Sequence, residues 1–324
     1  MAMKIYAALA AMLAGFLEWI SKPVQNLSEQ YLSRMGLLWR ATDTAYQTQY
    51  RQEIIMGFEQ HQTLTRATVT TEAVIKGNTA IFLVVDSGGA VAVNRGVNGL
   101  IPARADANTQ NTCTLTEWHD LVRKTSFNIF ASQGNQREVM QKTSIAVINR
   151  KIDSQIIDVL NTGTVTIGSS TTIPNVSLFQ NGRVKLSNAS VPWDSRITLL
   201  CQPPFLAYME QAPEFANAQY VTDKPYGAGD SNPSWQDKPM VYRWRNALIM
   251  EHPNLPGKGT SSEKSFLYHQ SSTGHAANTG EMESEVGYNG EQAYSWARAS
   301  IFMGAVLMQN AGVVVITHDG SAYA

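Results

Sequence analysis

Hydrophobic and polar positions alternate with a helical period over one long stretch in the middle of the chain. After the first step, apolar residues recur three or four positions apart, at Met140, Ile145, Ile148, Ile152, Ile156 and Val159. Asn135, with Glu138 three positions later, has the form of a capping box. The pattern predicts one amphipathic helix from Asn135 to Asn161. Such a helix would span roughly 40 Å, so we expect it to be the rigid spine of the fold.

The pattern before residue 60 is also helical. Ile5–Leu17 is an apolar run, and in a helix Leu9, Leu13, Phe16 and Ile20 would form a stripe of large side chains. No cleavage site follows before Pro23, and Glu18 interrupts the run too early for a membrane span. We therefore interpret it as an Ala-rich helix that is buried or lies between chains. A helical period resumes over residues 23–60.

From Thr63 the period changes to two. Residues 65–73 alternate, Lys76, Gly77 and Asn78 form a break, and Thr79–Val85 is rich in β-formers. This predicts a long β-hairpin. Because an isolated two-stranded ribbon is marginally stable in water, we expect it to dock on another surface. Two short β-segments, Cys113–Trp118 and Leu121–Phe130, are then predicted to lead into the long helix.

The second half of the chain reads as a mixture of helices, strands and polar loops. Predicted helices are Asn175–Leu186 and Phe205–Gln211, the latter ended by Pro213. Arg196–Cys201 is predicted to be a buried strand and Met240–Met250 a strand pair, with a surface loop over residues 221–239. The apolar C-terminal stretch Tyr294–Ile316 is predicted to supply central strands.

The low fraction of charged residues predicts that much of the surface meets other chains. The chain has 324 residues and a formal net charge of −1, which gives no electrostatic reason to expect nucleic acid or anionic lipid as an obligate partner. Charged residues make up 16%, against about 25% in an average soluble domain. Cys113 and Cys201 match neither a disulfide framework nor a zinc spacing and are predicted to be free thiols.

No sequence pattern strongly indicates a catalytic, metal-binding or cofactor-binding site. The six histidines are scattered, and only His269 and His275 share a polar stretch. No nucleophile elbow is present, and Pro256–Thr260 lacks the spacing of a phosphate loop. Glu281, Glu283 and Glu285 are predicted to be solvated, and Tyr242–Arg245 to be a packed strand rather than a nucleic-acid surface. We therefore predict no cofactor, no metal and no enzymatic activity.

The order of these parts resembles the major capsid protein of tailed bacteriophages, the Hong Kong 97-type shell fold, and is most similar to the versions from short-tailed phages. A helical arm with Tyr46, Tyr50 and Phe58 precedes the hairpin, and Asn135–Leu160 stands where the family has its spine helix. Other segments that support the resemblance are Ser190–Leu200 with Pro203, Phe215–Ala218, Trp244–Met250 with Asn254–Pro256, and Gly304–Ile316. The resemblance covers residues 40–317.

This resemblance implies an α+β subunit of an icosahedral shell that assembles from pentamers and hexamers around double-stranded DNA. It implies an N-terminal helical arm (1–60), an extended β-hairpin loop (61–108), a peripheral domain with the spine helix (109–170), an axial domain (171–240), and the axial remainder with return strands (241–324). Expected partners are copies of the chain, a separate scaffolding protein, a portal, packaged DNA bound without sequence specificity and a decoration protein. The expected location is the virion capsid, assembled in the host cytoplasm, with no membrane.

Five charged residues are candidates for contacts between subunits. They are Arg66, Glu72, Lys76, Arg137 and Glu138. Lys76 is placed at the tip of the predicted hairpin, where covalent cross-linking to a neighbour is disfavoured against a simple exposed turn. Two other functions stay open at this point: a β-rich phage or surface binding module, and an enzyme whose site would lie between His269 and Glu285.

Overall fold

The computed structural model describes residues 12–14, 60, 62–74, 76–96, 99, 101, 103–132, 135–216, 241–278 and 282–323. Two compact units divide the chain, Met1–Ile55 and Met56–Ala324, and every element below belongs to the larger one. Residues 12–14 are helical. The remainder of the predicted Ile5–Leu17 helix, all of the predicted helical region 23–60 except residue 60, and the predicted loop 221–239 lie outside the described residues.

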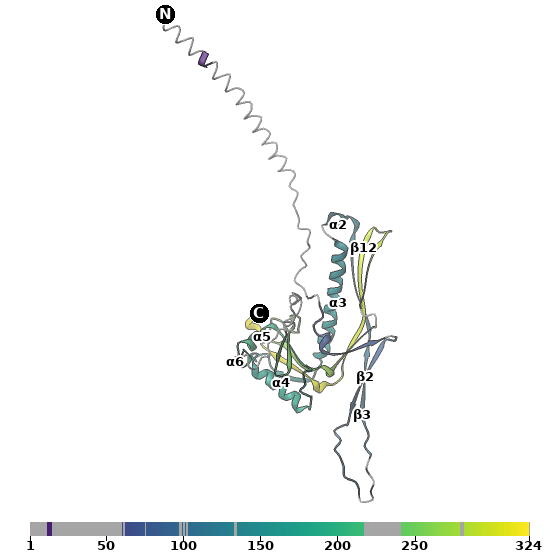
Figure 1. The fold of residues 1–324 in the computed structure, drawn as a ribbon, viewed down its shortest axis with the longest axis vertical. Coiled ribbons are helices and arrows are strands. Elements are labelled where there is room, and N and C mark those ends of the chain that lie inside the picture. Colours follow the sequence, from purple (N-terminus) through teal and green to yellow (C-terminus); the bar gives the residue numbers. More distant parts are fainter. Residues whose placement is uncertain are drawn as a thin grey trace. The chain divides into compact units, whose positions relative to one another are not determined.

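The strands of the larger unit form two sheets and a ribbon (Figure 1). The first, here called the long sheet, contains β1 (Thr70–Val74), β10 (Thr273–Asn278), β12 (Tyr294–Leu307), β11 (Glu283–Asn289) and β4 (Thr116–Thr125). The central sheet has the order β5 (Val165–Gly168), β13 (Val313–His318), β9 (Glu263–His269), β6 (Ile197–Cys201), β8 (Ala247–Glu251) and β7 (Val241–Trp244). The predicted C-terminal strands are confirmed, because β12 and β13 lie inside these sheets.

The predicted spine helix is confirmed as α3 (Gln136–Leu160). Its N-cap is Asn135, whose side chain accepts a hydrogen bond from the Glu138 backbone N–H. The buried stripe matches the prediction in its middle and shifts at the C-terminal end, where Ile157 and Leu160 are buried. Predicted stripe members Ile145 and Val159 are only half-buried, because α3 meets two layers and buries a wider face than one stripe.

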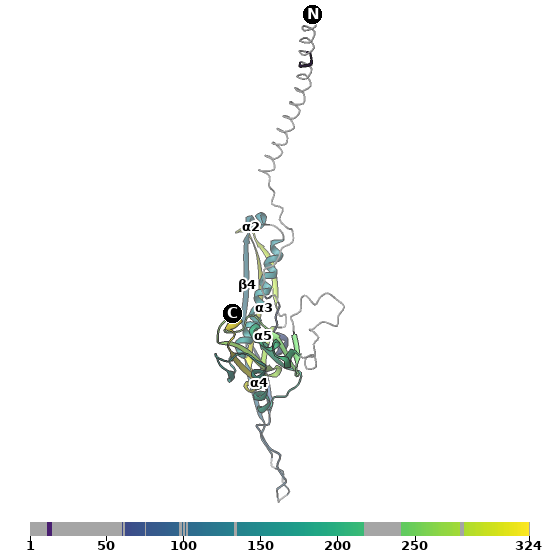
Figure 2. The ribbon, with the colours of Figure 1, turned by 90° about the vertical axis from the view of Figure 1, so that its left-hand side faces the viewer.

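The two layers that α3 contacts are the two sheets. Every second residue of β12 faces the helix, and these residues are Ala297, Ala299, Ile301 and Met303. From the central sheet, Phe266, Tyr268, Val313 and Val315 belong to the same buried cluster as Ile148, Ile152 and Ile156. The helix runs beside β12 in Figure 1 and beside β4 in Figure 2. It therefore joins the two sheets into one rigid body.

The opposite face of the central sheet is covered by shorter helices. They are α4 (Val176–Asn188), α5 (Pro203–Glu210) and α6 (Pro213–Ala216). Strand residues of alternate parity, such as Leu199, Leu267 and Val314, pack beneath them. The predicted helices are confirmed, except that Pro213 begins a further short helix after α5 has ended at Glu210.

The predicted hairpin is wrong in its pairing. β1 pairs in parallel with β10, whereas β2 (Thr79–Asp86) pairs with β3 (Ala107–Thr114). Local alternation identifies residues 70–74 as extended, but the partner is decided by burial, since β1 lies in register with the buried Ala276 and Ala277 of β10. Lys76 consequently lies in an exposed bend between β1 of the long sheet and β2 of the ribbon, and residues 87–106 connect β2 to β3.

The two short β-segments predicted before α3 are also corrected. Leu115 separates β3 from β4, so the first segment belongs to two different strands. The second ends at Thr125, because the Thr125 side chain accepts a hydrogen bond from the Asn128 N–H and begins the helix α2 (Ser126–Ala131).

The root of the ribbon is fixed to the long sheet by a small buried cluster. Ala80, Phe82 and Cys113 pack against Ala276. At Gly304 a Cβ atom would clash with the Thr114 carbonyl oxygen and lie 2.9 Å from the Cys113 Sγ. Close approach of β3 to β12 therefore requires glycine at this position.

This approach gives a stability prediction. Gly304→Ala is expected to lower the free energy of unfolding by about 1–3 kcal/mol, because β3 must move away from β12. The buried Cys113 thiol, whose pKa burial raises, should then react faster with a maleimide. Urea unfolding and thiol labelling measure both effects. Gly290→Ala, where a Cβ meets no atom within 4 Å, is the matched control; equal stability of the two variants would show that β3 is not held at this point.

Candidate assembly surfaces

The residues with catalytic or metal-binding potential are distributed among structural roles. Within the described part of the chain, no group of three or more His, Cys, Asp or Glu side chains is placed to hold a metal ion. Glu285 is paired with Arg298 at 2.8 Å, Glu283 is exposed, and Glu281 lies outside the described residues. His275 is buried inside the long sheet and does not form a site with His269.

The aromatic residues around β7 belong to the core, as predicted. Trp244 is fully buried and lies 5.1 Å from Phe179, while Tyr242 contacts Phe215. One detail differs: Arg245 is not on the strand but in a turn, with φ of 49°, and its guanidinium lies over the Trp244 ring. The aromatics therefore offer no stacking surface to nucleic acid.

A buried carboxylate connects the segment before β1 to the spine helix. Asp153 of α3 accepts hydrogen bonds from the backbone N–H groups of Leu64 and Thr65 and from the Thr65 hydroxyl at 2.7 Å. Gln60 and His252 also contact it. Burial alone would raise the pKa of Asp153, but the hydrogen bonds from His252, Leu64 and Thr65 outweigh it and lower that pKa. The chain entering the larger unit is thus fixed to α3.

A second buried polar pair lies in the central sheet, where Glu263 of β9 is in register with His318 of β13. Glu263 Oε2 and His318 Nδ1 are 3.6 Å apart, and both side chains are inaccessible to solvent. Glu263 Oε1 accepts a hydrogen bond from the Gly259 N–H, and His318 Nε2 lies 2.9 Å from the Ser265 hydroxyl. Burial raises the pKa of Glu263 and lowers the pKa of His318 to about 4. The site therefore favours the uncharged form of each group.

This pair gives a prediction with a pH signature. Glu263→Gln is expected to stabilise the subunit at pH 8 by roughly 1 kcal/mol, because the amide keeps the acceptor for Gly259 and removes a buried ionisable group. The gain should shrink toward pH 4, where the wild-type carboxyl is protonated in both states. Urea unfolding at both pH values measures the difference. A variant less stable than wild type at pH 8 would instead show that a charged pair with His318 stabilises the fold.

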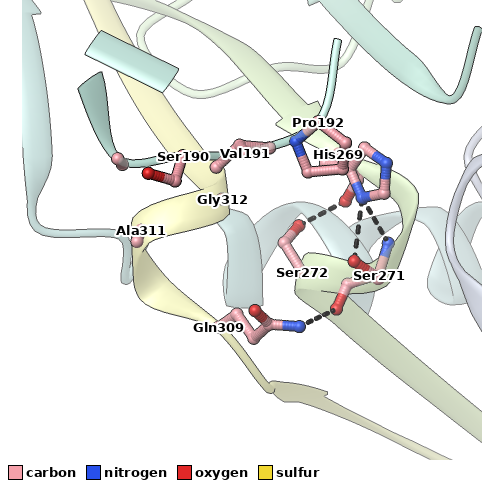
Figure 3. Close-up of a pocket in the computed structure, with 10 residues that line it drawn as sticks. Ser190, Val191, Pro192, His269, Ser271, Ser272, Gln309, Ala311 and Gly312 are labelled. Carbon is pink, nitrogen blue, oxygen red and sulfur yellow. Dashed lines mark hydrogen bonds between the residues drawn. The ribbon is translucent and has the colours of Figure 1, made fainter. Parts of the chain in front are cut away.

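A small pocket beside His269 contains residue types found in hydrolases (Figure 3). His269 Nε2 lies 3.1 Å from Asp194 Oδ1, and His269 Nδ1 lies 2.8 Å from the Ser271 hydroxyl. However, Nδ1 also accepts a hydrogen bond from the Ser271 backbone N–H, so the imidazole caps the short turn that follows β9. The pocket encloses about 100 Å³, well below the ~300–1,000 Å³ of ligand pockets. The hydrogen bonds between His269 and Ser271 therefore stabilise this turn and do not form a catalytic site.

One face of the β2–β3 ribbon is an uncovered apolar surface. Ile81, Leu83 and Val85 share one face and are 60%, 58% and 70% exposed. Across the ribbon they are flanked by uncharged polar residues, Thr112, Gln110 and Asn108. Among the described residues nothing packs on this face. We call Ile81, Leu83 and Val85 the ribbon surface.

A second uncovered apolar surface lies on α2, at the opposite end of the long sheet from the ribbon (Figure 1). Phe127 and Phe130 are 75% and 89% exposed. The Ser126 N–H and hydroxyl both donate to the Ala293 carbonyl, which fixes α2 to the turn between β11 and β12. We call Phe127 and Phe130 the tip surface. The ribbon surface lies within the hairpin that was predicted to dock on another surface, whereas Phe127 and Phe130 of the tip surface were not among the predicted contact residues.

The five predicted contact residues lie in two separate places. Arg66, Glu72 and Lys76 surround β1, and Glu72 and Lys76 are exposed. Arg137 and Glu138 begin α3, beside the tip surface, and both already have a partner within the chain: Arg137 Nε contacts the Ser295 hydroxyl at 3.3 Å, and Glu138 pairs with Lys142 at 2.7 Å. The hydrogen bond and charge of Lys142 lower the pKa of Glu138.

Comparison with solved structures shows the same fold in phage shells. The chain in the structure of "Mycobacterium phage Che8" is 16% identical, with a TM-score of 0.61, covering 82% of this chain and 95% of that one. For the head structure of Helicobacter pylori bacteriophage KHP40 the values are 11% identity, TM-score 0.63, and 83% and 94% coverage. The capsid of Ralstonia phage GP4 is 8% identical, with a TM-score of 0.62, covering 85% of this chain and 95% of that one.

Sequence comparison identifies the family. No curated protein matches the sequence, and no described helix is both long and apolar enough to cross a membrane. A family model described as phage capsid protein matches residues 42–320. The particular similarity to short-tailed phages stays a prediction. Since the model spans most of the sequence and the fold is the Hong Kong 97-type shell fold, this chain belongs to the phage capsid protein family, whose members are structural proteins rather than enzymes.

Proposed function

We propose that this chain is the major capsid subunit of a tailed bacteriophage, and that its copies form the pentamers and hexamers of an icosahedral shell around double-stranded DNA. The observation that supports this best is the ribbon surface. Ile81, Leu83 and Val85 are exposed on a ribbon whose root is buried in its own subunit. An apolar row held out from a rigid body suits docking on a neighbouring copy.

The rest of the larger unit suits the same role. α3 holds the two sheets together, so the body can keep its shape while the ribbon contacts a neighbour. Contacts of one surface with a different surface of the next copy generate closed rings when the rotation closes. Each contact can then be weak while the shell as a whole is stable, because many contacts act together.

The domain division that we propose follows the family. Residues 1–60 form the arm, 61–108 the extended loop, 109–170 the peripheral domain with α3, 171–240 the axial domain, and 241–324 the axial remainder with the return strands. The strand bounds move the end of the extended loop to Thr114, where β3 ends.

The partners that we propose beyond copies of the chain are a scaffolding protein, a portal, a decoration protein and packaged DNA, with assembly in the host bacterial cytoplasm. A net charge of −1 gives the chain no strong electrostatic attraction for DNA, so the contact that we propose with packaged DNA is weak and not sequence-specific.

Electron microscopy of the purified full chain over a concentration series tests this function. Closed shells of uniform diameter, appearing above a threshold concentration, are the expected result. Dimers or other small oligomers at every concentration would contradict it and favour a binding module.

A further inference from the structure

We propose that the tip surface, Phe127 and Phe130, is a contact between copies of this chain, in which the α2 helices of neighbouring subunits meet. This inference rests on the proposed function as a shell subunit, and it concerns a different surface from the ribbon. The ribbon surface and the tip surface lie at opposite ends of the larger unit (Figure 1).

The backbone around α2 holds both rings outward. Thr125 caps the helix, and Ser126 ties it to the Ala293 carbonyl with bonds of 2.9 and 3.0 Å. Phe127 and Phe130 are three positions apart and so share one face of the helix. At 75% and 89% exposure, they make little contact with the rest of the described chain.

These rings therefore contribute little to folding of the free subunit. Ser126–Ala131 contains no charged residue, so the helix itself adds no charge beside the rings. Aromatic side chains that cover nothing in their own chain are typical of the buried centre of a contact with another molecule.

The size of the tip surface indicates what kind of contact this is. Two phenylalanines at these exposures offer roughly 300 Å² per copy, against the ~800 Å² per partner of a stable, specific interface. A separate protein that bound only here would bind weakly. A second copy of this chain is different, since in a closed shell it is already held by other contacts and the effective concentration is high.

Charge at the rim also fits a second copy. Arg137 and Glu138 stand side by side at the start of α3. Lys124 at the end of β4 donates to Gln136 at 2.7 Å, which keeps the start of α3 beside α2. A rim that carries both signs is complementary to itself when two copies meet around a symmetry axis.

The double variant Phe127→Ser/Phe130→Ser tests the proposal. Its melting temperature as a free subunit should equal that of wild type, because the rings are exposed. Its threshold concentration for shell formation should rise at least tenfold, measured by sedimentation. Val184→Ser, which removes a 54%-exposed apolar side chain from α4, is the matched control and should assemble like wild type. A double variant that assembles at the wild-type threshold would overturn the proposal.

A cross-linking experiment identifies the occupant directly. The native Cys113 and Cys201 are both buried, so Phe130→Cys introduces a single accessible thiol among the described residues. In assembled Phe130→Cys particles, a short bifunctional maleimide should join copies of the chain, and dilute free subunits should stay unlinked. Shells that form without cross-links would overturn this inference and leave the proposed function standing. Absence of shells from wild type as well would overturn both.

Discussion

The triple variant Ile81→Thr/Leu83→Thr/Val85→Thr is expected to fold normally and to fail to form shells. Threonine is β-branched and suits a strand, and the buried root of the ribbon at Phe82 and Cys113 is untouched. Each of the three aliphatic side chains is more than half exposed in the subunit. Docking them would contribute on the order of 1 kcal/mol each, so their loss should weaken each ribbon contact more than a hundredfold.

Two measurements separate assembly from folding in this variant. Thermal unfolding of the free subunit should match wild type, and sedimentation should find no shells at ten times the wild-type threshold. A control variant, Ile173→Thr/Val184→Thr, changes two exposed apolar residues elsewhere and should assemble normally. Normal assembly of the triple variant would show that the ribbon surface is not a docking surface.

Asp153→Asn is expected to cost about 3–5 kcal/mol of unfolding free energy at pH 7. The carboxylate accepts from Leu64, Thr65 and His252 in a site that water does not reach, and an amide can satisfy only part of that set. Because these hydrogen bonds lower the pKa of Asp153, its contribution is fully present above pH 3.8 and is lost as the pH falls through the lower folded value.

The control for this variant is Asp158→Asn, an exposed carboxylate one turn further along α3, which should change stability by less than about 0.5 kcal/mol. Urea unfolding at pH 7 and pH 3 measures both variants. A cost at pH 7 that is no larger than that of the control would mean that the segment at Leu64 and Thr65 is not anchored by this carboxylate.

Sequence patterns predicted those elements whose environment is set by local periodicity. α3 was predicted to within one residue because its cap and its stripe are both encoded within 27 positions of the chain, 135–161. The buried strands β6, β12 and β13 were identified by continuous apolar character. The pairing of β1 was not predicted, because its partner β10 lies about 200 residues later in the chain. The sequence of β3, ANTQNTCT, has no alternation of apolar residues that would identify it as the partner of β2.

The contact surfaces were harder to predict than the fold. Charged residues were chosen as candidates because an exposed charge is easy to recognise in a sequence, yet Arg137 and Glu138 already have partners within the chain. Phe127 and Phe130 have the same residue type as core aromatics, and only their 75% and 89% exposure distinguishes them. The exposure of these two rings depends on tertiary structure, and no pattern within Ser126–Ala131 indicates it.

A β-rich binding module explains the structure less well than a shell subunit does. α3 is 25 residues long and buries its face against two sheets, which makes the helix the centre of the body. The pocket at His269 was the remaining candidate for an enzyme site. The His269 Nδ1 atom there accepts a hydrogen bond from the Ser271 backbone N–H and so belongs to a turn.

Amide hydrogen exchange of residues 81–85 and 107–111, compared between dissociated subunits and assembled shells, tests most directly whether the ribbon finds its partner on another copy. These amides should exchange with low protection in the free subunit and become strongly protected in the shell, while α3 stays protected in both. Equal protection in free subunits and shells would mean that the ribbon gains no partner on assembly, which would contradict its role as the docking element between subunits.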